Sequence, residues 1–208
     1  MIHEIFFQNI LKTFIAIDPV ALIPIFAALS SSISINKILK LSVIIFFTSS
    51  FVISFFAIFG NIFLEFIGIS IFSFQIAGGI FLFFIAFEML FEKRSERKKK
   101  LIKSDKSEEY LISMSIFPIS IPLIVGPSAI TLSILISENF DFSFTTIYVQ
   151  ILPLILVIFL TCILFIFSGV LSSLLGMSLI LILQKLFGII LGALAVEFIL
   201  SGLKLDLV

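Results

Sequence analysis

Six long apolar stretches dominate this chain of 208 residues, and each is long enough to cross a lipid bilayer as a helix. A transmembrane helix needs about 20 apolar residues to span the hydrocarbon core. The stretches are 5–29, 41–63, 67–91, 111–137, 145–168 and 178–203. Because a helix satisfies its own backbone hydrogen bonds in lipid, we expect an all-α, polytopic membrane protein with six transmembrane helices.

The composition excludes a soluble domain of this size. Charged residues make up 12% of the chain, whereas soluble domains carry about 25%. The first stretch lacks a basic start and a small-residue cleavage site, so we expect it to stay in the protein and not to act as a signal peptide. With one cysteine, Cys162, and one histidine, His3, the chain has no metal-ligand cluster, and we expect no cofactor.

Basic residues are concentrated in alternate loops, which predicts the orientation of the chain. Segment 92–109 carries eight Lys and Arg residues, whereas the loops after the second and fourth stretches carry none. Under the positive-inside rule the odd-numbered loops are cytoplasmic, and both termini lie outside the cytoplasm. Acidic residues interleaved in 92–109 weaken a nucleic-acid or anionic-lipid interpretation. We interpret this segment as a topology anchor and expect no nucleic-acid partner.

The two halves of the sequence resemble each other. This divides the single membrane domain, 1–208, into repeat one (1–91), the basic loop (92–109) and repeat two (110–208). Three crossings in each half make an odd number, so the second half enters the membrane inverted, as in many secondary transporters. Chance similarity between apolar segments is the alternative. At an offset of 109 the pairs are Gln75/Gln184, Gly79/Gly188, Ile80/Ile189, Ala86/Ala195 and Glu88/Glu197.

Prolines interrupt the first and fourth stretches. Their five-residue spacing pairs Pro19 with Pro122, and Pro24 with Pro127, at an offset of 103. A proline inside a helix removes a hydrogen bond and costs about 3 kcal/mol. In a membrane such a break survives where the backbone is buried in protein or faces water. We therefore expect helices 1 and 4 to be broken by prolines, to lie side by side and to carry the binding site.

Asp18 is the one acidic residue well inside an apolar stretch. A carboxylate at the bilayer centre costs at least about 2.5–3.5 kcal/mol, so Asp18 should face the protein interior or water. It serves either as a proton, sodium or substrate site, or as a cap for a helix that begins at Pro19. The candidate substrate- or ion-binding residues are Asp18, Pro19, Pro24, Pro122, Gly126, Pro127, Ser128, Gln75 and Gln184.

Four further polar positions are open to two interpretations. Gln75 and Gln184 either line a pathway or form hydrogen bonds between helices. Glu88 is expected in the interface at the cytoplasmic end of the third stretch, and Glu197 deeper in the sixth.

Three motifs, DPVALIPIF at 18–26, QIAGGIFLFFIA at 75–86 and FPISIPLIVGPS at 117–128, resemble the MarC-type family. This is a group of six-span bacterial inner-membrane proteins, in a superfamily that includes amino-acid exporters. The resemblance implies the fold, the bacterial inner membrane and, as a function class, transport of a neutral amino acid. The chain departs from many members at residues 20–23 and at Ser128, where glycine is common, and the added bulk implies a narrowed site.

The leading hypothesis is a secondary transporter of a small solute, and the alternative is a non-transporting membrane scaffold. We expect no enzyme, because the sequence has neither HExxH nor GxSxG and no second histidine. The expected partners are membrane lipid, a small solute and a coupling H⁺ or Na⁺. A homo-oligomer is compatible with the sequence.

Overall fold

The computed structural model describes residues 2–30, 33–91 and 108–205, and this part of the chain is helical and has no strand. The first four helices are α1 (Ile2–Ile17), α2 (Pro19–Ser30), α3 (Ile35–Phe66) and α4 (Ile71–Leu90). The later ones are α6 (Glu108–Met114), η1 (Ser115–Ile124), α7 (Pro127–Ile136), α8 (Phe144–Thr146), η2 (Ile147–Ile151), α9 (Leu152–Ile166) and α10 (Ser168–Leu205).

Four segments of the described chain are long and apolar enough to cross a membrane alone: α3, α4, the run from α8 through α9, and α10. Two bent pairs add two spans if each pair is one crossing. The first is α1 with α2, bent by 49°, and the second is Glu109–Ile124 with α7, bent by 62°. The all-α fold and the interruption of the first and fourth stretches are thereby confirmed.

The span ends differ from the expected ones where glycine or a cap intervenes. The third begins at Ile71 and not at residue 67, because Gly68 turns the chain at φ 78° and Ser70 caps α4 by accepting the Ser73 N–H at 3.1 Å. The sixth begins ten residues early, at Ser168, and bends at Gly176, where φ is 66°. Glycine adopts positive φ without the clash that a Cβ causes.

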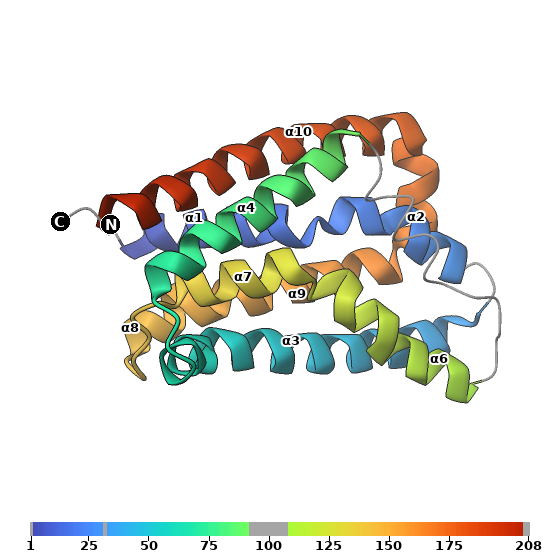
Figure 1. Ribbon diagram of the computed structural model, residues 1–208. Helices are drawn as coiled ribbons and strands as arrows, with labels where there is room; N and C mark the ends of the chain where they lie inside the picture. The colour runs from blue at the N-terminus through green and yellow to red at the C-terminus, as the bar shows by residue number, and fades with distance from the viewer. Residues whose placement is uncertain (1, 31–32, 92–107, 206–208) are drawn as a thin grey trace.

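The broken pair α1–α2 lies in the middle of the bundle (Figure 1). The long helix α10 runs along α4 and also packs against α2, and on the other side α3 packs against α9, α7 and η1. The helix α1 contacts both α7 and α9, so the two broken spans share the protein interior.

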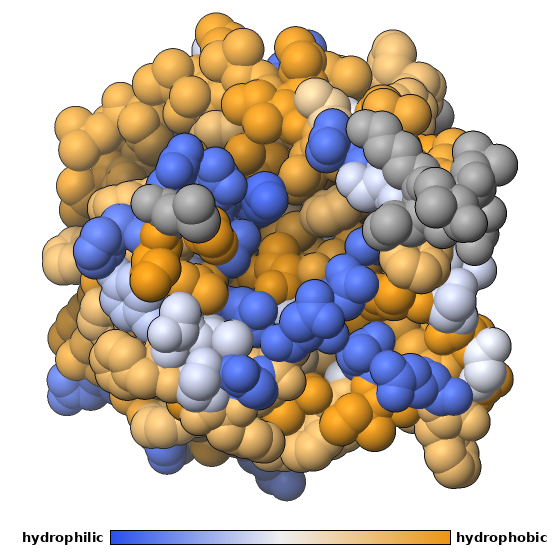
Figure 2. Space-filling view, turned by 90° about the vertical axis from the view of Figure 1, so that its left-hand side faces the viewer, coloured by the Kyte–Doolittle hydropathy of each residue, from blue (hydrophilic) through white to orange (hydrophobic). Residues whose placement is uncertain are grey.

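Polarity is reversed relative to a soluble protein. The exposed surface of the helices carries many large apolar side chains, among them Phe47, Phe51 and Phe159, whereas Asp18, Ser120 and Gln184 are buried. Figure 2 shows one end of the molecule, where hydrophilic side chains gather centrally inside a largely hydrophobic outline. This distribution fits a protein whose sides face lipid and whose ends face water.

The start of α1 and the end of α10 lie at the same end of the molecule, and α4 ends and α6 begins at the opposite end (Figure 1). An even number of crossings requires this arrangement. Most of the basic loop lies outside the described residues, so its role as a topology anchor stays a prediction.

Candidate functional site

The first break is a single residue, Asp18. Its N–H completes the last turn of α1 by donating to the Phe14 carbonyl at 2.9 Å. Its φ of 54° then turns the chain into α2, a conformation that aspartate tolerates better than most residues. Its Oδ1 accepts the N–H of Ala21 at 3.4 Å, the hydrogen bond of a helix cap, and the side chain is fully buried. The capping role therefore has a structural basis, and an ionic role stays a prediction.

The break does not extend to Pro24, contrary to expectation. Pro24 lies inside α2, which continues without interruption to Ser30. The missing N–H of Pro24 removes one hydrogen bond, but the turns on both sides remain helical. The chain is therefore broken before Pro19 and not around Pro24.

The second break is longer and has three steps. Phe117 (φ −133°, ψ 120°) and Ile121 (φ −130°, ψ 122°) are extended inside η1, and each precedes a proline. Proline disfavours a helical conformation of the residue before it, which accounts for both extended residues, whereas Ile23 before Pro24 stays helical within α2. Gly126, with ψ 179°, then precedes α7, which begins at Pro127.

Glycine at position 126 permits a close approach within this break. A Cβ on Gly126 would lie 2.7 Å from the Pro122 carbonyl oxygen, which is too close for any side chain. The folded-back turn is held by the Val125 N–H, which donates to the Ser120 carbonyl at 2.8 Å.

The two breaks are in direct contact. Ser128 Oγ, in the first turn of α7, donates a hydrogen bond of 2.8 Å to the carbonyl of Ala16 in the last turn of α1. Both residues are buried, and α1 packs against α7. Ser128 was among the candidate binding residues expected from the sequence, whereas Ala16 was not, because a backbone acceptor leaves no signal in the side-chain pattern.

The two breaks have a common feature at their ends. Asp18 and Gly126 each precede a second half-helix, and Pro19 and Pro127 are each its first residue. This places Pro19 opposite Pro127, an offset of 108, and not opposite Pro122. The proline spacing in the sequence pairs Pro19 with Pro122 instead, and in the structure Pro19 begins α2 whereas Pro122 lies within η1, before the bend.

The two second half-helices begin differently. Asp18 caps α2 with its side chain. The residue at the corresponding cap position before α7 is Gly126, and α7 has no side-chain cap. The first N–H groups of a helix have no partner within it and carry partial positive charge. The start of α7 therefore carries partial positive charge next to the last turn of α1.

Gln184 lies on the face of α10 that packs against the first break. Ile180, one turn earlier, is in a buried cluster with Val20, and Phe187, one turn later, contacts Phe14 with ring centroids 5.6 Å apart. Because these α10 residues share one face, Gln184 faces the junction of α1 and α2. It is 1% exposed, and its Nε2 has no hydrogen-bond partner in the described part of the chain.

Gln75 lies elsewhere. Its Nε2 donates to Glu138 Oε2 at 3.2 Å, beyond the end of α7 and away from both breaks. This geometry matches the interpretation that Gln75 links helices. The structure thus brings together the residues around Asp18, Gly126 and Gln184, and it separates Gln75 from them.

The structure buries Glu88, which was expected in the interface, and places Glu197 at the surface of α10. Glu88 is buried because α10 packs across the end of α4, where Gly188 meets Met89. Glu197 is exposed on α10, close enough to Lys12 of α1 for an electrostatic interaction.

The contact between α4 and α10 is reciprocal. A Cβ on Gly79 would lie 2.7 Å from the Ala195 carbonyl oxygen, and a Cβ on Gly188 would lie 3.2 Å from the Ala86 carbonyl oxygen. In the sequence comparison at an offset of 109, Gly79 pairs with Gly188 and Ala86 pairs with Ala195. The contact of Gly79 with Ala195 thus has the same two residue types as the contact of Gly188 with Ala86, with the two helices exchanged, which is the pattern of a two-fold symmetric interface.

Comparison with known proteins agrees with the membrane fold. The model of the family described as "MarC family integral membrane protein" matches residues 3–207. A UPF0056 membrane protein of Buchnera aphidicola subsp. Baizongia pistaciae is 33% identical over 97% of this chain and 93% of its own. A UPF0056 membrane protein of Archaeoglobus fulgidus is 34% identical over 98% of this chain and 94% of its own. The UPF0056 membrane protein YhcE of Escherichia coli is 29% identical over 96% of this chain and 92% of its own. No solved structure matches the chain.

Proposed function

The chain belongs to the MarC family of integral membrane proteins, and on that premise we propose that it is a secondary transporter of a small solute. The two inverted halves, 1–91 and 110–208, would alternate in exposing a site between the helix breaks to either side of a membrane. The observation that carries the proposal is the buried hydrogen bond from Ser128 to Ala16, which joins the two breaks. Broken spans that meet inside a bundle are the usual place of a transport site.

The reciprocal contact of α4 with α10 supports the inverted repeat that this mechanism needs. Gly79 and Gly188 each approach the backbone of the opposite helix, and Leu82 and Leu191, also 109 apart, are both fully buried in the same cluster. An interface built this way lets two halves exchange roles with little change in packing.

The chemistry around the breaks favours a solute that carries both a negative and a positive group. The start of α7, without a side-chain cap, suits a carboxylate. The buried Asp18 carboxylate suits an ammonium group or a coupling H⁺ or Na⁺, and Gln184 Nε2 can donate to a further oxygen. A neutral amino acid meets these requirements, and we propose this class of solute. No enzymatic step is part of the proposal.

The competing function is a membrane scaffold in which the breaks only shape packing. An untargeted comparison of metabolites inside and outside cells, with and without the protein, tests the two. Transport predicts that at least one small solute shifts between the compartments and that purified protein in proteoliposomes moves that solute. Unchanged metabolites together with inactive proteoliposomes would favour the scaffold.

A further inference from the structure

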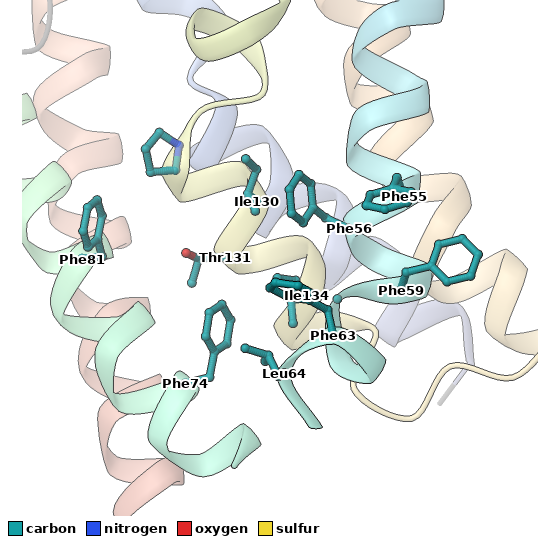
Figure 3. A pocket seen from close by; sticks show the side chains of 12 residues that line it. Phe55, Phe56, Phe59, Phe63, Leu64, Phe74, Phe81, Ile130, Thr131 and Ile134 are labelled. Atoms are coloured by element: carbon teal, nitrogen blue, oxygen red, sulfur yellow. The ribbon is translucent and has the colours of Figure 1, made fainter. Parts of the chain in front are cut away.

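A groove of about 630 Å³ opens between α3, α4 and α7, separate from the polar side of the helix breaks (Figure 3). Its walls are aromatic, with Phe56 and Phe59 from α3 and Phe74 and Phe81 from α4. Its floor is α7, from Pro127 to Ile134. The helices α3 and α4 follow each other in the chain, yet each packs more against α7 than against the other, and this leaves the space between them.

Small residues hold this geometry in place. Gly60 of α3 sits against Ile134, and Gly78 of α4 sits against Thr131, and a Cβ at either glycine would overlap the α7 side chain. Both α3 and α4 therefore lie close to α7 at these glycines. The large aromatic side chains farther from α7 keep α3 and α4 apart. The groove therefore results from the packing of α3 and α4 against α7.

The length and position of the groove match one leaflet of a bilayer. It runs along α3 from Phe55 to Leu64, which is about 14 Å of helix. Half of a hydrocarbon core of about 30 Å is about 15 Å. The groove lies next to the turn at Gly68, where α3 ends, so it occupies the half of the membrane next to that end.

The charged residues just beyond the groove, on α3 and after α7, are acidic. Glu65 near the end of α3 is exposed, Glu138 lies just past the end of α7, and Asn61 bonds to both, to Glu65 Oε1 at 3.2 Å and to the Glu138 carbonyl at 3.3 Å. Residues 41–92 and 107–184 contain no lysine or arginine. These parts of α3, α4 and α7 therefore bring acidic and no basic side chains to this end of the groove, which suits a head group with an ammonium group better than an anionic one.

We propose that this groove binds one acyl chain of a zwitterionic phospholipid, with the head group beside Glu65 and the chain lying along α7. The chain would contact Pro127, the first residue after the second helix break. A bound lipid would thereby line the outer side of the α7 half-helix, while the polar site lies on its inner side.

Tryptophan fluorescence tests this directly, because the protein contains no tryptophan. Single-tryptophan variants Phe74→Trp and Phe56→Trp, made separately, place the probe in the groove with a conservative aromatic change. Phe159→Trp on α9, 53% exposed, reports on bulk lipid, and the fully buried Phe165→Trp reports on the core. Each purified variant in detergent is titrated with brominated phosphatidylcholine, whose bromines quench tryptophan on contact.

Occupation of the groove predicts that Phe74→Trp and Phe56→Trp are half-quenched at a several-fold lower mole fraction of lipid than Phe159→Trp, while Phe165→Trp stays bright. Brominated phosphatidylglycerol should need a higher mole fraction than brominated phosphatidylcholine. Equal titration curves at the groove and at Phe159 would overturn the proposal. So would a groove probe that resists lipid but is quenched by aqueous acrylamide, or one shielded from both by a second copy of the chain.

Discussion

Ser128 Oγ donates a hydrogen bond to the carbonyl oxygen of Ala16 at 2.8 Å, and so joins the first turn of α7 to the last turn of α1. The contact crosses between the two halves of the chain at the level where both broken spans bend. A hydrogen bond at this place ties the geometry of one break to that of the other.

The first prediction concerns this bond. Ser128→Ala should lower the free energy of unfolding by about 0.5–1.5 kcal/mol, the usual net contribution of such a hydrogen bond. The matched control is Ser133→Ala on the same helix, because Ser133 Oγ bonds only within α7, to the Ile130 carbonyl at 2.8 Å. Chemical unfolding in detergent compares them. If Ser133→Ala lowered the free energy of unfolding more than Ser128→Ala does, the hydrogen bond between the two breaks would not have the stabilising role predicted here.

The second prediction concerns the reciprocal helix contact. Gly79→Ala places a methyl group 2.7 Å from the Ala195 carbonyl oxygen, so α4 and α10 must separate, at a cost of about 1–3 kcal/mol. A Cβ at Gly188 would lie 3.1 Å from Met89 Cβ, a less severe contact, so Gly188→Ala should lower the stability less. Gly169→Ala meets nothing within 4 Å and should be neutral or stabilising. Thermal unfolding ranks the three, and a Gly79→Ala protein as stable as Gly169→Ala would contradict the packing.

Much of the fold follows from the sequence, because apolar length alone determines where a chain can span a membrane. The extended residues Phe117 and Ile121 each precede a proline, which disfavours a helical conformation there. The extent of the first break does not follow from the sequence, since Pro24 could end a helix or lie within one, and packing on both sides of α2 decides the outcome. Contacts made by backbone atoms, such as the Ala16 carbonyl, depend on tertiary structure and leave no trace in residue type.

The third prediction separates the two roles of Asp18. Asn can accept the Ala21 N–H and tolerates positive φ, so Asp18→Asn should fold normally. Asp18→Ala should lose the cap, worth about 1 kcal/mol, and should express less well. If Asp18 carries a coupling proton or cation, Asp18→Asn abolishes the dependence of proteoliposome transport on a pH or sodium gradient. Equal gradient-driven rates in wild type and Asp18→Asn would leave the residue as a cap.

The fourth prediction concerns orientation in the cell. The start of α1 and the end of α10 share one end of the molecule, and the charge pattern predicts that this end lies outside the cytoplasm. Tags at both termini should react with an impermeant reagent in intact cells, and a tag in 92–109 should react only after lysis. A terminus labelled on the same side as 92–109 would contradict the six-span arrangement.

In an alternating-access transporter the helix breaks are exposed in turn to each side of the membrane, and cysteine accessibility measures this exposure. Cys162 is the single cysteine and is buried, so Cys162→Ser provides a cysteine-free background. In it, Ser128→Cys places a thiol between the breaks, and Phe159→Cys places one on the lipid-facing side of α9. Membrane vesicles of both orientations are treated with a charged, impermeant maleimide. Alternating access predicts that Ser128→Cys is labelled from both sides and Phe159→Cys from neither. A Ser128→Cys protein that stays unlabelled from both sides, or reacts from one side alone, would contradict it.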